Sequence, residues 1–214
     1  IELQNFLKES GDTPGTRKTF IYNTFEKLMK AISKSLKKND PNHLNLGIRY
    51  GYIEQLDDEL LRISKESFDA LSFNCYALSP DHEKMNHALE ISGLPMIIGE
   101  YHFGTVDRGL AQSLWQVNSQ KERGDAFRYY TENAFAHRGL IGTGWFRWID
   151  QNINGRTDGE NYNCGFIDVT DRPYPYMVDA AIETAKSLYE IHSGTKTPFH
   201  QAPNAVGHSP IPDL

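Results

Sequence analysis

One carboxylate stands out in the sequence because of the segment that leads to it. Glu100 follows residues 95–99, Pro-Met-Ile-Ile-Gly, and such an apolar run is typical of a buried strand in a parallel sheet. A carboxylate at the end of that strand could act as a nucleophile, an acid or a base, and glycoside hydrolysis uses a pair of such groups. The structural alternative is a Glu that pairs with a nearby Arg or caps a helix.

Other polar and aromatic side chains also stand where predicted strands end. They are Arg49, Asn74, Tyr76, His102, Trp145 and Trp148. Parallel strands end at one edge of their sheet, and both (β/α)8 barrels and open α/β sheets build their sites at that edge. Aromatic rings there could stack on a flat ligand such as a sugar, although most aromatic residues of any protein belong to its core.

The elements that must position these residues alternate along the chain. Apolar residues at helical spacing predict helices, and short apolar runs between them predict strands. One helix is expected between the capping signal at 12–14 and the stop at 40–42, and others at 56–67, 80–91, 120–137 and 176–192; the expected strands are 43–50, 68–76, 94–101 and 140–148. The first three strands recur about every 25 residues with a helix between each pair, which predicts βα units and a parallel sheet.

The number of strands decides which α/β architecture is expected. A complete (β/α)8 TIM barrel needs eight strands and about 250 residues, whereas this sequence contains only four clear strands. No Gly-rich turn of the Rossmann type follows any of them. We therefore expect the C-terminal half of a TIM barrel, about strands five to eight, over residues 1–192. Residues 193–214 are rich in Pro, Gly and His and are expected to form an irregular tail.

The composition narrows the class of function. The chain has 214 residues, a net charge of −6 and 39% hydrophobic residues, which is typical of a soluble globular protein. The acidic balance disfavours nucleic-acid binding, and no apolar run approaches the ~20 residues that cross a membrane.

Residues 150–161 approach the EF-hand calcium pattern, but Asn161 stands where that loop needs a bidentate Glu. We therefore expect no metal and no cofactor.

Several segments resemble one known family. Residues 99–104 (GEYHFG) and 107–109 (DRG) resemble the nucleophile strand of glycoside hydrolase family 50, the beta-agarases, in a large clan of (β/α)8 glycosidases. Residues 145–161 look like that family's eighth strand and the loop after it. The segments 40–49 and 72–76 (SFNCY) look like its fifth and sixth strands, whose motifs are also shared by family 42 beta-galactosidases.

The resemblance implies a retaining glycosidase that acts on agarose, a polysaccharide with β-linked galactose. Glu100 would be the nucleophile, and Tyr76 would donate a hydrogen bond that keeps Glu100 ionised. Trp145 would be the stacking platform under the sugar at the cleavage point, while His102 and Asn74 would contact sugar hydroxyls. The further substrate-binding candidates are Arg49, which could equally form a structural ion pair, Trp148 and Asp150.

The resemblance also points to residues outside this sequence. In this clan an Asn-Glu pair at the end of strand four carries the acid/base, and no Asn-Glu pair occurs here. We therefore expect the chain alone to have little activity, and to associate with the missing N-terminal barrel half or to form a homodimer, because free sheet edges recruit other strands. The parent protein is expected to be secreted or periplasmic. The alternatives are a beta-galactosidase of the same clan and a non-catalytic carbohydrate-binding fragment.

Overall fold

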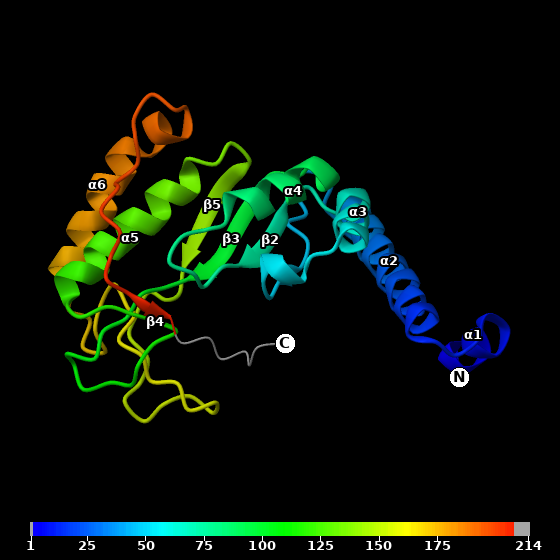
Figure 1. Ribbon diagram of the computed structural model, residues 1–214, viewed down its shortest axis with the longest axis horizontal. Helices are drawn as coiled ribbons and strands as arrows, with labels where there is room; N and C mark the ends of the chain where they lie inside the picture. Colours follow the sequence, from blue (N-terminus) through cyan, green and yellow to red (C-terminus); the bar gives the residue numbers. More distant parts are fainter. Residues whose placement is uncertain (1, 208–214) are drawn as a thin grey trace.

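A parallel sheet of four strands lies at the centre of the molecule, whose computed structural model describes residues 2–207 (Figure 1). The strands are β1 (Arg49–Tyr50), β2 (Leu71–Asn74), β3 (Met96–Tyr101) and β5 (Leu140–Trp145). They lie in the order β1-β2-β3-β5, and each neighbouring pair is parallel. This arrangement confirms the predicted α/β class with a parallel sheet.

Two helices precede the first strand, and the others lie in the connections between strands. They are α1 (Glu2–Ser10), α2 (Pro14–Asn39), the 3-10 helix η1 (Ile53–Gln55), α3 (Asp58–Ser67), α4 (His82–Ser92), α5 (Gln120–Phe135) and α6 (Pro175–His192). The start of α2 agrees with the predicted capping signal, because the Thr13 side chain accepts a hydrogen bond from the Thr16 backbone N–H in a capping box. The side chains of Asp57, Asp81 and Ser119 also accept backbone N–H hydrogen bonds and so cap the starts of α3, α4 and α5.

All four strands are shorter than the sequence predicts, although β3 lacks only the first two residues of the predicted segment 94–101. The segments 68–76 and 140–148 form strand only over 71–74 and 140–145, and the segment 43–50 only at Arg49–Tyr50. The start of that last segment is held outside the sheet by Asp69, whose carboxylate accepts from the Asn45 backbone N–H at 2.7 Å. A strand extends only as far as it forms backbone hydrogen bonds with a neighbouring strand, and β1 pairs with β2 through two residues.

The sequence did not predict α1 or a small antiparallel pair outside the main sheet. This pair joins β4 (Trp115–Gln116), in the loop after β3, to β6 (Val206–Gly207), in the expected tail. The predicted tail is therefore irregular only in part, since its strand ties it to a loop at the carboxyl edge of the sheet. Residues 208–214 of the tail lie outside the described residues.

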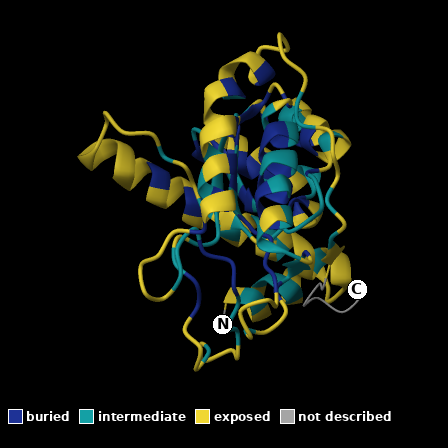
Figure 2. Cartoon of the chain, turned by 90° about the vertical axis from the view of Figure 1, so that its left-hand side faces the viewer, coloured by how far each residue is buried: buried dark blue, intermediate teal, exposed yellow. Residues whose placement is uncertain are grey.

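The core lies between one face of the sheet and the helices. Its fully buried sheet residues are Leu71, Phe73, Met96, Ile98, Tyr101 and Leu140. Along β2 and the start of β3 every second residue is buried in this way, and the residues between them are partly exposed on the opposite face. Figure 2 shows the same division, with buried residues in the interior and the outward faces of the helices exposed.

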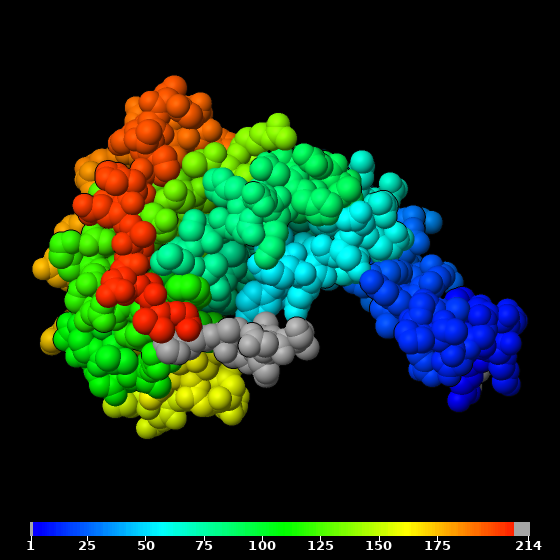
Figure 3. Space-filling view, in the orientation of Figure 1, coloured from blue at the N-terminus to red at the C-terminus, as the bar shows by residue number. Residues whose placement is uncertain are grey.

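The helices α1 and α2 project from one end of the body (Figure 3). α2 is attached through a small cluster in which Met29 packs with Ile63 and Phe68. Several large apolar residues of α2 remain exposed, namely Ile21, Leu28, Ile32 and Leu36. Within residues 2–207, no helix has both the length and the apolar character that crossing a bilayer would require.

Candidate active site

Glu100 lies at the end of β3 and is surrounded by hydrogen-bond donors from the neighbouring strands. An Nη2 atom of Arg49, from β1, lies 2.8 Å from Glu100 Oε1. The amide Nδ2 of Asn74, at the end of β2, donates to Glu100 Oε2 at 3.0 Å. Two residues later the hydroxyl of Tyr76 donates to the same oxygen at 2.9 Å. The structure therefore brings together four of the residues that the sequence singled out.

This carboxylate is largely buried, since only 19% of its side chain is exposed. A buried charge is costly unless donors replace the lost water, and three donors do so here. Burial and the negative charge of Glu100 raise the pKa of Tyr76 well above its usual value, so its phenol stays protonated and remains a donor. The Glu100 side chain is therefore held in one orientation. A carboxylate held in this way is suited to attack an electrophilic carbon atom or to stabilise a positively charged one.

His102 is buried beside the Glu100 site. Its ring is 1% exposed, Nε2 accepts from the Leu114 backbone N–H at 3.2 Å, and Nδ1 lies 3.1 Å from the Phe146 carbonyl oxygen, to which it donates. Burial lowers the pKa of His102 to about 3, so the ring is neutral at ordinary pH. The ring lies edge-on to Tyr76 at 5.0 Å, so in this structure it packs against one of the donors to Glu100.

Asp150 is also buried rather than open to a ligand. It is 5% exposed, and its two oxygens accept hydrogen bonds from the Asn163 side chain, the Gly165 backbone N–H and the Tyr174 hydroxyl. These partners come from the loop between β5 and α6 and from the residue that precedes α6. In this structure Asp150 therefore anchors the loop between β5 and α6.

The two tryptophans at the end of β5 differ in accessibility. Trp145 is half-buried, donates from Nε1 to the Cys164 carbonyl oxygen at 2.7 Å, and packs edge-on against Tyr101. Trp148 is 68% exposed and stacks on Phe166 at 5.8 Å with an interplanar angle of 20°. One ring is thus fixed beside the carboxylate strand, and the other presents a free surface to planar ligands.

The sequence interpretation missed Arg123, which holds two loops of this region in place. The side chain is fully buried and donates to the carbonyl oxygens of Phe103 and Gly165, which lie after β3 and after β5. Burial lowers the pKa of its guanidinium. A signal was present in the sequence, because Arg123 shares a helix face with the buried Phe127 and Tyr130 at spacings of four and three residues.

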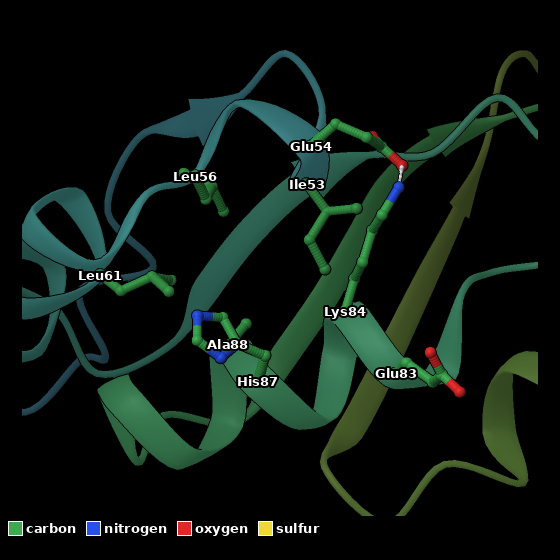
Figure 4. Close-up of a pocket in the computed structure, with 8 residues that line it drawn as sticks. All are labelled: Ile53, Glu54, Leu56, Leu61, Glu83, Lys84, His87 and Ala88. Atoms are coloured by element: carbon green, nitrogen blue, oxygen red, sulfur yellow. Dashed lines mark hydrogen bonds and ion pairs between the residues drawn. The ribbon is translucent and has the colours of Figure 1, made fainter.

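A separate crevice of about 370 Å³ lies between η1, α3 and α4 (Figure 4). Its apolar lining comes from Ile53, Leu56, Leu61 and Ala88, and an ion pair of 3.0 Å joins Glu54 to Lys84 beside it. None of the predicted site residues lines this crevice. The chemistry-bearing residues are therefore at the carboxyl edge of the sheet and not in this hollow.

Relatives of the chain are found by sequence, although no family model matches it. Over 165 residues it is 36% identical to Beta-agarase A of Vibrio sp. (strain JT0107), which covers 74% of this chain and 16% of that protein. Beta-agarase B of the same strain is 34% identical over 170 residues, or 76% of this chain and 17% of that protein. The chain thus spans about one sixth of the length of these curated relatives.

Solved structures give a similar result. The crystal structure of an agarase, AgWH50C, superposes with a TM-score of 0.77 and 34% identity, covering 83% of this chain and 25% of that one. The structure of an exo-beta-agarase gives a TM-score of 0.76 and 31% identity, covering 84% of this chain and 24% of that one. The fold described above is therefore also a part of larger agarase structures.

Proposed function

The chain corresponds to a region of glycoside hydrolase family 50, the beta-agarases, and we propose that this region supplies the nucleophile of a retaining glycosidase that cleaves agarose. The observation that carries the proposal is the Glu100 carboxylate, held by three donors at the end of a parallel strand. Relatives named as agarases support the substrate class. Neither the beta-galactosidase nor the non-catalytic alternative has support of this kind.

In the proposed first step, a Glu100 oxygen attacks the anomeric carbon of a β-linked galactose unit. The bond from that carbon to the leaving sugar oxygen breaks, and this oxygen takes a proton from an acid on the opposite side of the bond. Water then displaces Glu100 with the help of the same residue, now a base. Arg49, Asn74 and Tyr76 keep the attacking carboxylate in one orientation. This lowers the entropic part of the activation free energy for the first step.

We place the acid/base in a part of the enzyme outside this chain, and we propose that residues 1–192 form the second half of a (β/α)8 barrel. The support is that the four parallel strands follow one another across the sheet and that β1 and β5 leave two open edges. The larger agarase structures, of which the chain covers about a quarter, leave ample chain for the other half. Secretion of the longer enzyme remains a prediction.

The proposal is tested in the longer enzyme that contains this region. Glu100→Gln should lower kcat on agarose oligosaccharides by on the order of 10⁴-fold or more, because a carboxamide cannot form the glycosyl ester. A 2-deoxy-2-fluoro galactoside with a good leaving group should leave a covalent adduct on the peptide that contains Glu100. The matched control is Glu90→Gln on the exposed side of α4, which should retain full activity. A fully active Glu100→Gln variant, or an adduct on another residue, would refute the proposal.

A further inference from the structure

Beyond Ile98, β3 contains one residue more than the paired parts of β2 and β5. Toward β2, Ile98 pairs with Phe73, but the next pair joins Glu100 to Asn74, so Gly99 is left over. Toward β5, Ile98 pairs with Thr143 and Tyr101 with Trp145, which is three steps along β3 against two along β5. The strand is therefore bulged at residues 99–100, immediately at the carboxylate.

The bulge decides which face of the sheet Glu100 occupies. In a regular strand residue 100 would point the same way as Met96 and Ile98, which are fully buried against the helices. In the structure Tyr101 takes that side instead and stacks on Tyr130 of α5 at 4.0 Å. Glu100 is thereby turned to the opposite face, where its donors Arg49 and Asn74 lie.

Gly99 lies on that same face, and its missing side chain leaves space that Arg49 fills. A Cβ atom at Gly99 would lie 2.3 Å from Cδ and 3.0 Å from Cγ of Arg49, and 3.3 Å from Oδ1 of Asn74. The first distance is shorter than any stable contact between two non-bonded carbon atoms. The arginine stem therefore passes directly over Gly99 on its way to Oε1 of Glu100, at 2.8 Å.

We propose that Gly99 is a positioning residue, which acts through Arg49: its lack of a side chain opens the path by which the Arg49 guanidinium reaches and orients the Glu100 carboxylate. The role of Gly99 in the Arg49–Glu100 ion pair does not depend on whether the chain is catalytic. Its consequence for turnover rests on the proposed function of Glu100 as nucleophile. Gly144 of β5 approaches the bulge from the other side, since a Cβ there would lie 2.7 Å from the Gly99 carbonyl oxygen.

The structural part is tested on the 214-residue chain by a thermal-stability cycle. Gly99→Ala should lower Tm in the wild-type background and much less in an Arg49→Ala background, where the clashing Cγ and Cδ atoms are gone. Gly142→Ala is the matched control, because a Cβ there meets only Ile97 at an ordinary 3.6 Å. An equal loss of Tm in both backgrounds would overturn the proposal, and this comparison remains possible even if Gly99→Ala folds weakly.

Side-chain NMR of Arg49 gives a second structural measurement. Glu100→Gln should change the chemical shifts of the Arg49 guanidinium N–H groups, and this change shows what loss of the ion pair does to the spectrum. Gly99→Ala should move them in the same direction, whereas Gly142→Ala should leave them in place. Signals that stay at their wild-type positions in folded Gly99→Ala would contradict the clearance role of Gly99.

The functional part is tested in the longer enzyme. Gly99→Ala and Arg49→Ala should each lower kcat by roughly 10- to 100-fold with a smaller change in KM, and the double variant should be no slower than Arg49→Ala alone. Independent, multiplying effects would show that Gly99 does not act through Arg49. If the wild-type enzyme cleaves no agarose, the proposed function fails, while the stability cycle still decides the role of Gly99.

Discussion

Three donors converge on the Glu100 carboxylate, and each comes from a different point along the sheet edge: Arg49, Asn74 and Tyr76. Hydrogen bonds to a charged group contribute about 1.5–3 kcal/mol each, which is enough to offset the burial of one carboxylate. The Tyr76 ring is itself supported by the buried His102. At this scale, the site is a carboxylate whose orientation is fixed before any substrate arrives.

Removing one of these donors should slow turnover without unfolding the chain. In the longer enzyme, Tyr76→Phe should lower kcat by about 10- to 100-fold, because Glu100 Oε2 loses a donor while the ring still packs on His102. Steady-state kinetics on an agarose oligosaccharide measures this effect. Tyr189→Phe, at an 89% exposed position, is the control that should have wild-type kinetics. An unchanged kcat in Tyr76→Phe would show that this hydrogen bond has no part in catalysis.

At the scale of elements, α5 connects the sheet to the segments around it. Near its start Arg123 holds the loops after β3 and β5. Near its end the buried Glu132 pairs with Arg128 at 2.9 Å and accepts from the Phe199 backbone N–H at 2.8 Å, so it fixes the tail. Just beyond the helix His137 joins two further elements, since Nδ1 accepts from the Gly139 N–H and Nε2 lies 3.1 Å from Asn86 Oδ1 on α4.

The burial of His137 predicts a loss of stability in acid. Burial, followed by the nearby charges of His82, Arg138 and His192, lowers the pKa of His137 to about 4 from the ordinary 6.5. The unfolded chain therefore binds a proton at a higher pH than the folded one, so stability is complete above about pH 6.5 and falls as the pH decreases toward 4. The loss from this group reaches at most about 3 kcal/mol, and it does so only below about pH 4, where the folded chain also binds the proton.

Urea unfolding between pH 7 and pH 4.5 measures this dependence. The midpoint should decrease through this range, and the decrease should be shallower in His137→Gln, which has no proton to bind. His43→Gln is the control, because the His43 side chain is 82% exposed. The same slope in His137→Gln as in the wild type would rule out His137 as its origin.

At the scale of the whole molecule, the chain exposes more surface than a compact monomer of its mass. The chain exposes 12420 Å², whereas a compact monomer of 24.4 kDa would expose about 10,000 Å². Part of the excess lies on the projecting α2, where Ile21, Leu28, Ile32 and Leu36 are exposed. Together with the unpaired edges of β1 and β5, this exposed apolar surface favours association with other chains.

The chain alone is accordingly expected to self-associate through α2. Sedimentation velocity should show a concentration-dependent dimer, and Leu28→Glu with Ile32→Glu should shift it toward monomer, since each charge would have to be buried at the contact. Ile182→Glu is the control, because Ile182 is a 48% exposed residue of α6. A wild-type chain that remains monomeric at all concentrations would contradict this prediction.

Local patterns in the sequence predicted the helices α2 to α6 and the four parallel strands, and they drew attention to Glu100. Helical spacing, capping residues and apolar runs each act over a few residues, so α2 and β3 could be predicted without knowledge of their neighbours. The bulge at residues 99–100 could not, because it exists only relative to β2 and β5, which lie far away along the chain. The burial of His102 and Asp150, and the passage of Arg49 over Gly99, likewise depend on segments that only the folded chain brings together.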